Sequence, residues 1–123
     1  MILRQSRLLV ADNSGARIAM CIGIPGRPPT HASVGRLIKV AIKEIKPGVT
    51  LKVRPGEVHN ALIIRCRQML QRNDGRTIKF DENACVLLGA DLKPIGTRVS
   101  GPIPMELKKG NWLKILSLSS RVI

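Results

Sequence analysis

The stretch Arg72–Leu88, RNDGRTIKFDENACVLL, indicates a mainly β fold, because turn signals and strand signals alternate in it at short intervals. Asp74-Gly75 is a strong hairpin signal, since both residue types tolerate the positive φ that tight turns need. The run Thr77–Phe80 that follows has strand character. The polar corner Asp81-Glu82-Asn83 then separates it from an apolar strand, Ala84–Leu88. We therefore expect short strands joined by tight turns.

The same stretch holds Asp74, Asp81 and Glu82, in a chain with only eight acidic residues. Such a concentration raises the question of a catalytic or metal-binding cluster. The hairpin places the acids at opposite ends of one short strand, and a strand rises about 3.3 Å per residue. Asp74 and Asp81 are then roughly 20 Å apart, which is too far to share a metal ion or a proton. We predict that these acids are turn residues.

No other constellation in the sequence indicates an enzyme. The only histidines are His31 and His59, and the glycines near GIPGRPP are followed by prolines where a phosphate-binding helix would have to begin. The three cysteines are an odd number, are widely spaced and form no C-x-x-C pair, which argues against a disulfide framework and against a zinc site. We expect buried, reduced thiols at Cys21, Cys66 and Cys85.

The part of the chain before Arg72 also has the patterns of strands and turns. Leu37–Ile45 alternates, with apolar residues on one face and Lys39 and Lys43 on the other. Pro25–Gly35 contains three of the eight prolines, so a projecting loop or irregular ribbon is expected there. Further strands are predicted at Ser6–Val10, Ile18–Ile24 and Val58–Cys66.

The C-terminal quarter has helical signals. Pro104 suits a first helical turn, Lys108 and Lys109 suit the last turn, and Gly110 suits a stop. Asn111 is positioned to cap a second short helix that runs to Leu116. The sequence thus predicts one mainly β domain, with a small closed barrel over about residues 1–100 and two short helices within about 101–123.

The charge indicates a polyanionic partner. The 123 residues carry a net charge of +13, with a pI near 10.9, and a folded domain this basic is typical of proteins that bind nucleic acid. An anionic membrane is the less favoured partner, because no apolar run approaches the roughly 20 residues of a spanning helix and Met1–Val10 lacks the features of a secretory signal. The candidate RNA-binding residues are the basic side chains expected to point outward, with Arg65 and Arg67 alternating on one strand face. They are Arg17, Lys39, Lys43, Lys46, Arg65, Arg67, Arg72, Arg76 and Lys79.

Beyond these patterns, the run ALIIRCRQMLQRNDGRTIKFDENACVL resembles the signature of a known family, ribosomal large-subunit protein fourteen, of the bacterial or organellar type. The segments VADNSGAR, MCI, IKEI, PIGTRV, GPIPMELK and KILSL each resemble further family segments, in the same order. The resemblance extends from Met1 to Ile123.

The resemblance implies a five-stranded β-barrel with a projecting β-ribbon and two small C-terminal helices. It implies a structural protein without cofactor, metal or small-molecule substrate that binds large-subunit rRNA, lies beside ribosomal proteins three and nineteen, and reaches small-subunit rRNA to form intersubunit bridges. A ribosome silencing factor is an implied partner on the same surface. The matched interface residues are Thr97, Arg98, Lys108 and Lys114. The implied location is the ribosome of a bacterial cytoplasm, or of an organelle such as the mitochondrial matrix.

The sequence also departs from the family pattern. The expected ribbon tip, GRPPTHAS, is rich in proline where relatives carry basic residues, and Ser100, Met105 and Arg121 stand where other residue types are usual. We interpret this drift as a sign of an organellar ribosome. The alternative to a ribosomal protein is a free-standing basic barrel that acts on RNA away from the ribosome.

Overall fold

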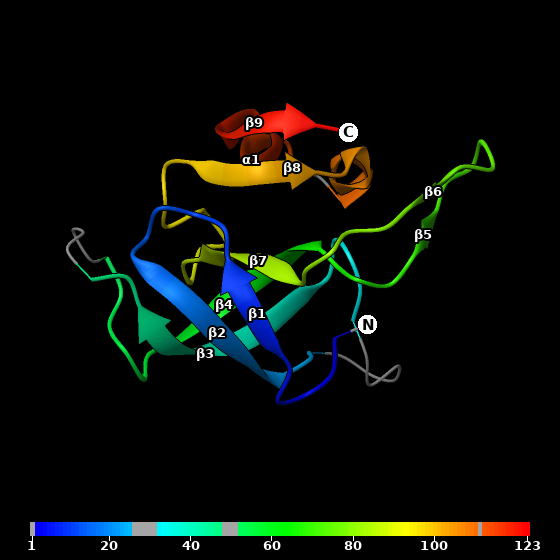
Figure 1. The fold of residues 1–123 in the computed structure, drawn as a ribbon. Helices are drawn as coiled ribbons and strands as arrows, with labels where there is room; N and C mark the ends of the chain where they lie inside the picture. Colours follow the sequence, from blue (N-terminus) through cyan, green and yellow to red (C-terminus); the bar gives the residue numbers. More distant parts are fainter. Residues whose placement is uncertain (1, 26–31, 48–51, 111) are drawn as a thin grey trace.

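The chain is built around a closed five-stranded β-barrel, which the computed structural model shows below a smaller C-terminal layer (Figure 1). The structure describes residues 2–25, 32–47, 52–110 and 112–123. In their order of pairing, the barrel strands are β1 (Arg7–Val10), β2 (Ala16–Gly23), β3 (Leu37–Ile45), β4 (Val58–Arg65) and β7 (Ala84–Leu88). Neighbours are antiparallel except β1 and β7, which are parallel and close the barrel. The predicted five-stranded barrel is confirmed.

The barrel strands form where the sequence patterns predicted them. β3 and β7 have the predicted bounds, and β1, β2 and β4 differ from prediction by one or two residues at their ends. In β3, Ile38, Val40 and Ile42 are buried while Lys39 and Lys43 are exposed. This alternation is that of a half-buried strand with one face in the core and the other in solvent.

β7 and the C-terminal part of β4, Ala61–Arg65, are buried on both faces. Ala61 and Ile63 of β4 belong to the core inside the barrel, whereas Leu62 and Ile64 belong to a second core on its outside. β7 divides its residues in the same way. The unbroken apolar runs in β4 and β7 are therefore explained, since a strand covered on both sides needs no polar face. The second core attaches the C-terminal layer to the barrel.

The C-terminal layer contains a small parallel sheet that the sequence did not predict. β8 (Val99–Ile103) pairs with β9 (Ser119–Val122), and the chain between them forms the 3₁₀ helix η1 (Met105–Gly110) and the α-helix α1 (Leu113–Leu118). The prediction of two C-terminal helices is not confirmed, because only one of the segments is α-helical. A helix of six residues makes few hydrogen bonds of either type, and both forms occur at this length here, η1 as a 3₁₀ helix and α1 as an α-helix.

A two-stranded ribbon projects from the barrel (Figure 1). It consists of β5 (Leu70–Gln71) and β6 (Thr77–Ile78), joined by the turn that contains Asp74 and Gly75. The ribbon predicted at Pro25–Gly35 is not confirmed, since residues 26–31 lie outside the described part of the chain.

The three cysteines, Cys21, Cys66 and Cys85, are buried, as predicted. Burial raises the pKa of the Cys21 thiol, against smaller opposing effects of the Gly23 backbone and of the Arg4 charge. Burial also raises the pKa of the Cys85 thiol, and the nearby Asp12 carboxylate adds to the effect. Because the thiolate is the reactive form, Cys21 and Cys85 are expected to be chemically inert in the folded protein.

Candidate nucleic-acid interface

Most acidic side chains are engaged in contacts within the chain. Carboxylate–guanidinium pairs join Glu44 to Arg17, Asp74 to Arg76, Glu82 to Arg65 and Glu106 to Arg72. These pairs are distributed over different elements, and the described residues contain no group of three or more His, Cys, Asp or Glu side chains able to hold a metal ion. The acids in the described part of the chain therefore act as structural partners, and the exposed surface is left predominantly basic.

Asp74 closes the ribbon turn, as predicted. Its carboxylate accepts hydrogen bonds from the Arg76 backbone N–H at 3.1 Å and from Arg76 Nε at 2.8 Å. Gly75 has a φ of +87°, the left-handed conformation that the Asp-Gly pair anticipated. The N–H donors of Arg76, first the backbone and then the side chain, lower the pKa of Asp74 below its usual 3.8.

The predicted RNA-binding residues divide into distinct groups. Lys39, Lys43, Lys46 and Lys79 are exposed and have no ion pair within the described residues. Arg17 and Arg76 are also exposed, but each is paired with a surface carboxylate. Such surface pairs contribute about 0–1 kcal/mol, so a phosphate can displace the carboxylate. Arg67 is exposed, while its Nε donates to the Asp81 carbonyl at 3.0 Å.

Arg65 does not point outward, and the prediction that it does is wrong. Its side chain is only 5% exposed and donates from Nη1 to the carbonyls of Ser100 and Pro102 at 2.9 and 3.0 Å. Nη2 pairs with Glu82 at 3.2 Å. β4 ends at Arg65, so Arg67 does not share a strand face with it. Arg65 therefore joins the barrel to β8 and is not available to RNA in this conformation.

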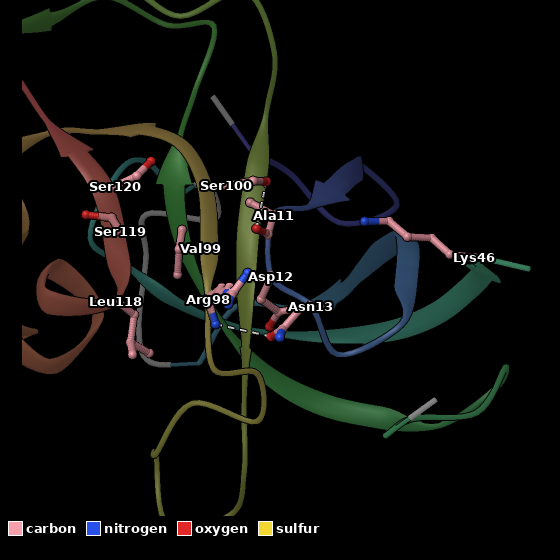
Figure 2. Close-up of a pocket in the computed structure, with 10 residues that line it drawn as sticks. All are labelled: Ala11, Asp12, Asn13, Lys46, Arg98, Val99, Ser100, Leu118, Ser119 and Ser120. Carbon is pink, nitrogen blue, oxygen red and sulfur yellow. Dashed lines mark hydrogen bonds between the residues drawn. The ribbon is translucent and has the colours of Figure 1, made fainter. Parts of the chain in front are cut away.

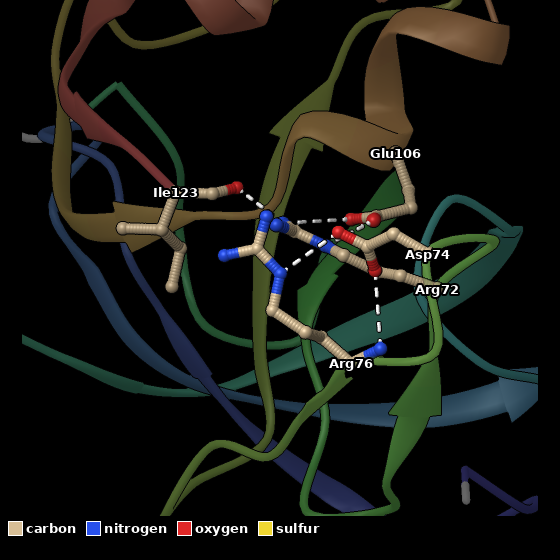
Figure 3. A network of polar contacts seen from close by, with 5 residues as sticks. All are labelled: Arg72, Asp74, Arg76, Glu106 and Ile123. Carbon is tan, nitrogen blue, oxygen red and sulfur yellow. Dashed lines mark hydrogen bonds and ion pairs between the residues drawn. The ribbon is translucent and has the colours of Figure 1, made fainter.

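Arg72 is likewise occupied, where β5 leads into the ribbon turn. Figure 3 shows its guanidinium group between Glu106 of η1 and the carbonyl of Ile123. Arg72 Nε lies 2.6 Å from Glu106 Oε1, and the Arg72 side chain is 21% exposed. Bidentate geometry and partial burial make such a pair stronger than a surface ion pair. Arg72 therefore fixes the ribbon against the C-terminal layer.

A hydrogen-bonded turn positions Thr97 and Arg98, two of the residues that the family resemblance implied at an interface. The side-chain oxygen of Asn13 accepts hydrogen bonds from the backbone N–H groups of Thr97 and Arg98 at 2.7 and 3.1 Å. Its amide nitrogen donates to Thr97 Oγ1 at 2.8 Å. A Cβ on Gly96 would lie 2.7 Å from Asn13 Oδ1, so glycine is required for this close approach.

Asp12, the residue before Asn13, anchors this turn to the barrel. It is 3% exposed, and its carboxylate accepts from Ser14 Oγ at 2.6 Å and from the Leu87 N–H at 3.1 Å. A buried carboxylate that receives several donors is held in one orientation. In the sequence, Asp12 and Asn13 appear only as part of the family segment VADNSGAR, although the density of polar residues in that segment was a signal of this role.

A groove of about 500 Å³ lies beside the turn, between the barrel and the C-terminal layer (Figure 2). It brings Lys46, predicted as an RNA contact, to the same groove as Arg98, predicted as an interface residue. Sequence reasoning did not identify the hydroxyl groups that complete its polar lining. These belong to Ser100, Ser119 and Ser120. The hydroxyls of Ser100 and Ser119 already donate to the backbone carbonyls of Ala11 and Leu116, so the groups that can donate to phosphate oxygens of RNA are those of Lys46, Arg98 and Ser120.

The other two predicted interface residues lie on the helical segments. Lys108 is exposed on η1 and Lys114 is exposed on α1, and neither lines the groove.

Among the described residues, no helix has the length and apolar character needed to cross a membrane.

A comparison with protein families identifies the chain. The model of the family described as ribosomal protein L14p/L23e matches residues 1–123. The chain belongs to this family. L14p/L23e proteins are structural constituents of the large ribosomal subunit that bind rRNA; they are not enzymes, and they work in ribosomes of the cytoplasm or of an organelle. The family resemblance proposed from the sequence is confirmed, and it implies that this L14p/L23e member binds rRNA.

Proposed function

We propose that this L14p/L23e protein uses two basic surfaces, one toward each ribosomal subunit. The first consists of the exposed lysines of the barrel and ribbon, chiefly Lys39, Lys43 and Lys79, and binds large-subunit rRNA. The second is the groove face, defined by Lys46, Thr97, Arg98 and Ser119, and it meets small-subunit rRNA in an intersubunit bridge.

The observation that carries the second assignment is the construction of the groove face. The Asn13 side chain makes three hydrogen bonds, one as donor and two as acceptor, and these fix Thr97 and the backbone of Arg98. Interfaces form with less entropic cost when their contact residues are already held in place. A solvated arginine on a loose loop would need no such support, and this favours a binding role for Arg98.

Further partners follow from the family resemblance. We propose that ribosomal proteins three and nineteen lie beside this chain in the large subunit. We also propose that Thr97, Arg98, Lys108 and Lys114 contribute to the surface on which a silencing factor docks and blocks subunit joining. The exposed Lys108 and Lys114 support this proposal, because they extend positive charge over the C-terminal layer.

Replacing cations on one surface at a time separates the two roles. Large subunits carrying Arg98→Ala are expected to keep the protein through a high-salt wash but to join small subunits less completely at limiting Mg²⁺. Lys39→Ala combined with Lys43→Ala is expected to do the reverse, because two phosphate contacts are lost from a binding affinity that high salt has already lowered. Sucrose-gradient sedimentation measures both outcomes.

Arg76→Ala is the matched control for Arg98→Ala, since Arg76 is an exposed arginine already paired within the chain. If Arg98→Ala joins small subunits as completely as Arg76→Ala does, the groove face is not a bridge surface.

A further inference from the structure

We infer that the outer face of the barrel holds a site for one unpaired RNA nucleotide, in which the Asn60 side chain reads the base. We call this site the Asn60 platform; it consists of Lys39, Val58, Asn60 and Leu88. The inference rests on the proposed binding of large-subunit rRNA and deepens it, by adding a residue that selects among bases.

The strand register places three members of the platform in one row. Lys39 of β3 is paired with Asn60 of β4, and Asn60 is paired with Leu88 of β7. Directly paired residues on adjacent strands project to the same side of a sheet. In β3 the residues on either side of Lys39 face the barrel core, so this row lies on the outer face.

The platform is open at one end. The C-terminal layer covers the outer face at Leu62 and Ile64, which are fully buried. Val58, two residues before Asn60 on the same face, is 56% exposed. A hollow of about 380 Å³ lies between these points, and its lining includes Lys39, Asn60 and Leu88. That volume is ample for a single nucleobase.

Asn60 is an unusual residue for this position. Asparagine is depleted in strands because its amide competes with the backbone for hydrogen bonds. The half-buried Asn60 side chain makes no hydrogen bond to any described residue. Its amide offers both donors and an acceptor, and this combination can pair with two neighbouring atoms on a base edge, most favourably N6 and N7 of adenine.

The surrounding residues suit the other parts of a nucleotide. Lys39 is exposed beside Asn60 and can contact a phosphate oxygen, while Val58 offers exposed apolar surface to the face of the base. Leu88 is fully buried and contributes only to the floor of the hollow. His59 is less suited to reading a base, because its Nε2 lies 3.0 Å from Glu57 Oε2. Sequence-specific recognition of RNA acts mostly on unpaired nucleotides, whose base edges are free. These features favour an unpaired nucleotide over a duplex.

The test measures base preference with the full-length protein. Fluorescein-labelled single-stranded hexamers of A, C, G and U are titrated at about 50 mM salt, where phosphate contacts remain strong. The wild-type protein is expected to bind the A hexamer at least fivefold more tightly than the weakest of the four. Asn60→Ala is expected to reduce this ratio to near one, and Lys39→Ala to weaken all four hexamers alike.

Asn73→Ala provides the control, because Asn73 is an exposed asparagine of the ribbon turn, and circular dichroism checks that each variant is folded. The inference is overturned if the wild-type protein shows no base preference, if Asn60→Ala keeps the preference, or if no hexamer binds while the protein still sediments with large subunits. Failure to sediment with large subunits would instead overturn the proposed function.

Discussion

Single side chains join parts of this protein that are distant in the sequence, and their roles depend on where strands end. Arg65 and Arg67 look equivalent in the sequence, but the pairing of β4 with β7 shifts register between Ile63 and Arg65. Such an irregularity redirects a side chain. Arg65 is thereby buried against β8, while Arg67 remains exposed. A single sequence cannot reveal this shift, because it depends on the partner strand.

The contact between Arg65 and Gly101 yields a prediction at the residue scale. Gly101 has a φ of +78°, and a Cβ there would overlap Nη1 of Arg65. Gly101→Ala is expected to lower the free energy of unfolding by about 1–2 kcal/mol for the left-handed backbone, and further by disturbing the Arg65 hydrogen bonds. Equilibrium unfolding in urea measures the change.

Gly56→Ala is the matched control for Gly101→Ala. Gly56 has a φ of +85°, but a Cβ there would meet no atom within 4 Å. It therefore carries the backbone cost alone. If Gly101→Ala destabilises the protein no more than Gly56→Ala does, Arg65 does not depend on the absence of a side chain at Gly101.

Among elements, the ribbon is the part whose placement depends most on a few contacts. β5 and β6 have only two residues each, and a two-stranded ribbon of this size has little stability of its own. Its described polar links to the C-terminal layer include the Arg72–Glu106 ion pair and the bond from Arg72 to the Ile123 carbonyl. We therefore expect the ribbon and the C-terminal layer to be ordered together.

Two arginines of the ribbon allow this coupling to be tested. Arg72→Met removes the links to Glu106 and Ile123, whereas Arg76→Met removes only the local pair with Asp74. Arg72→Met is expected to speed amide hydrogen exchange in η1 and β9 by about tenfold or more, because a partly buried ion pair is lost. Equal exchange in both variants would show that apolar packing alone holds the C-terminal layer.

Elements with a clear hydrophobic period were predictable, whereas elements defined by tertiary pairing were not. β3 followed from its alternation and the ribbon turn from Asp74-Gly75. β9 was missed because Ser119–Val122 has no strand pattern and pairs with β8 across an intervening pair of short helices. η1 had the terminal signals of an α-helix, but those signals do not distinguish a 3₁₀ segment from an α-helix when the segment is short.

For the whole molecule, composition predicted a polyanionic partner but not the arrangement of its surface. The net charge of +13 indicated nucleic acid, and the family motifs indicated the ribosome. The groove face remained hidden, because Lys46, Arg98 and Ser119 come from separate parts of the sequence. The fold collects them by closing the barrel and placing β8 and β9 over it.

Directed hydroxyl-radical probing can test whether the two basic surfaces face different ribosomal subunits. Because Cys21, Cys66 and Cys85 are buried, an iron chelate can be attached selectively to Arg98→Cys or to Lys39→Cys. Arg98→Cys is expected to cleave small-subunit rRNA only in joined ribosomes, whereas Lys39→Cys is expected to cleave large-subunit rRNA in free and joined subunits alike. Cleavage of large-subunit rRNA alone from Arg98→Cys, or of small-subunit rRNA from Lys39→Cys, would contradict this expectation.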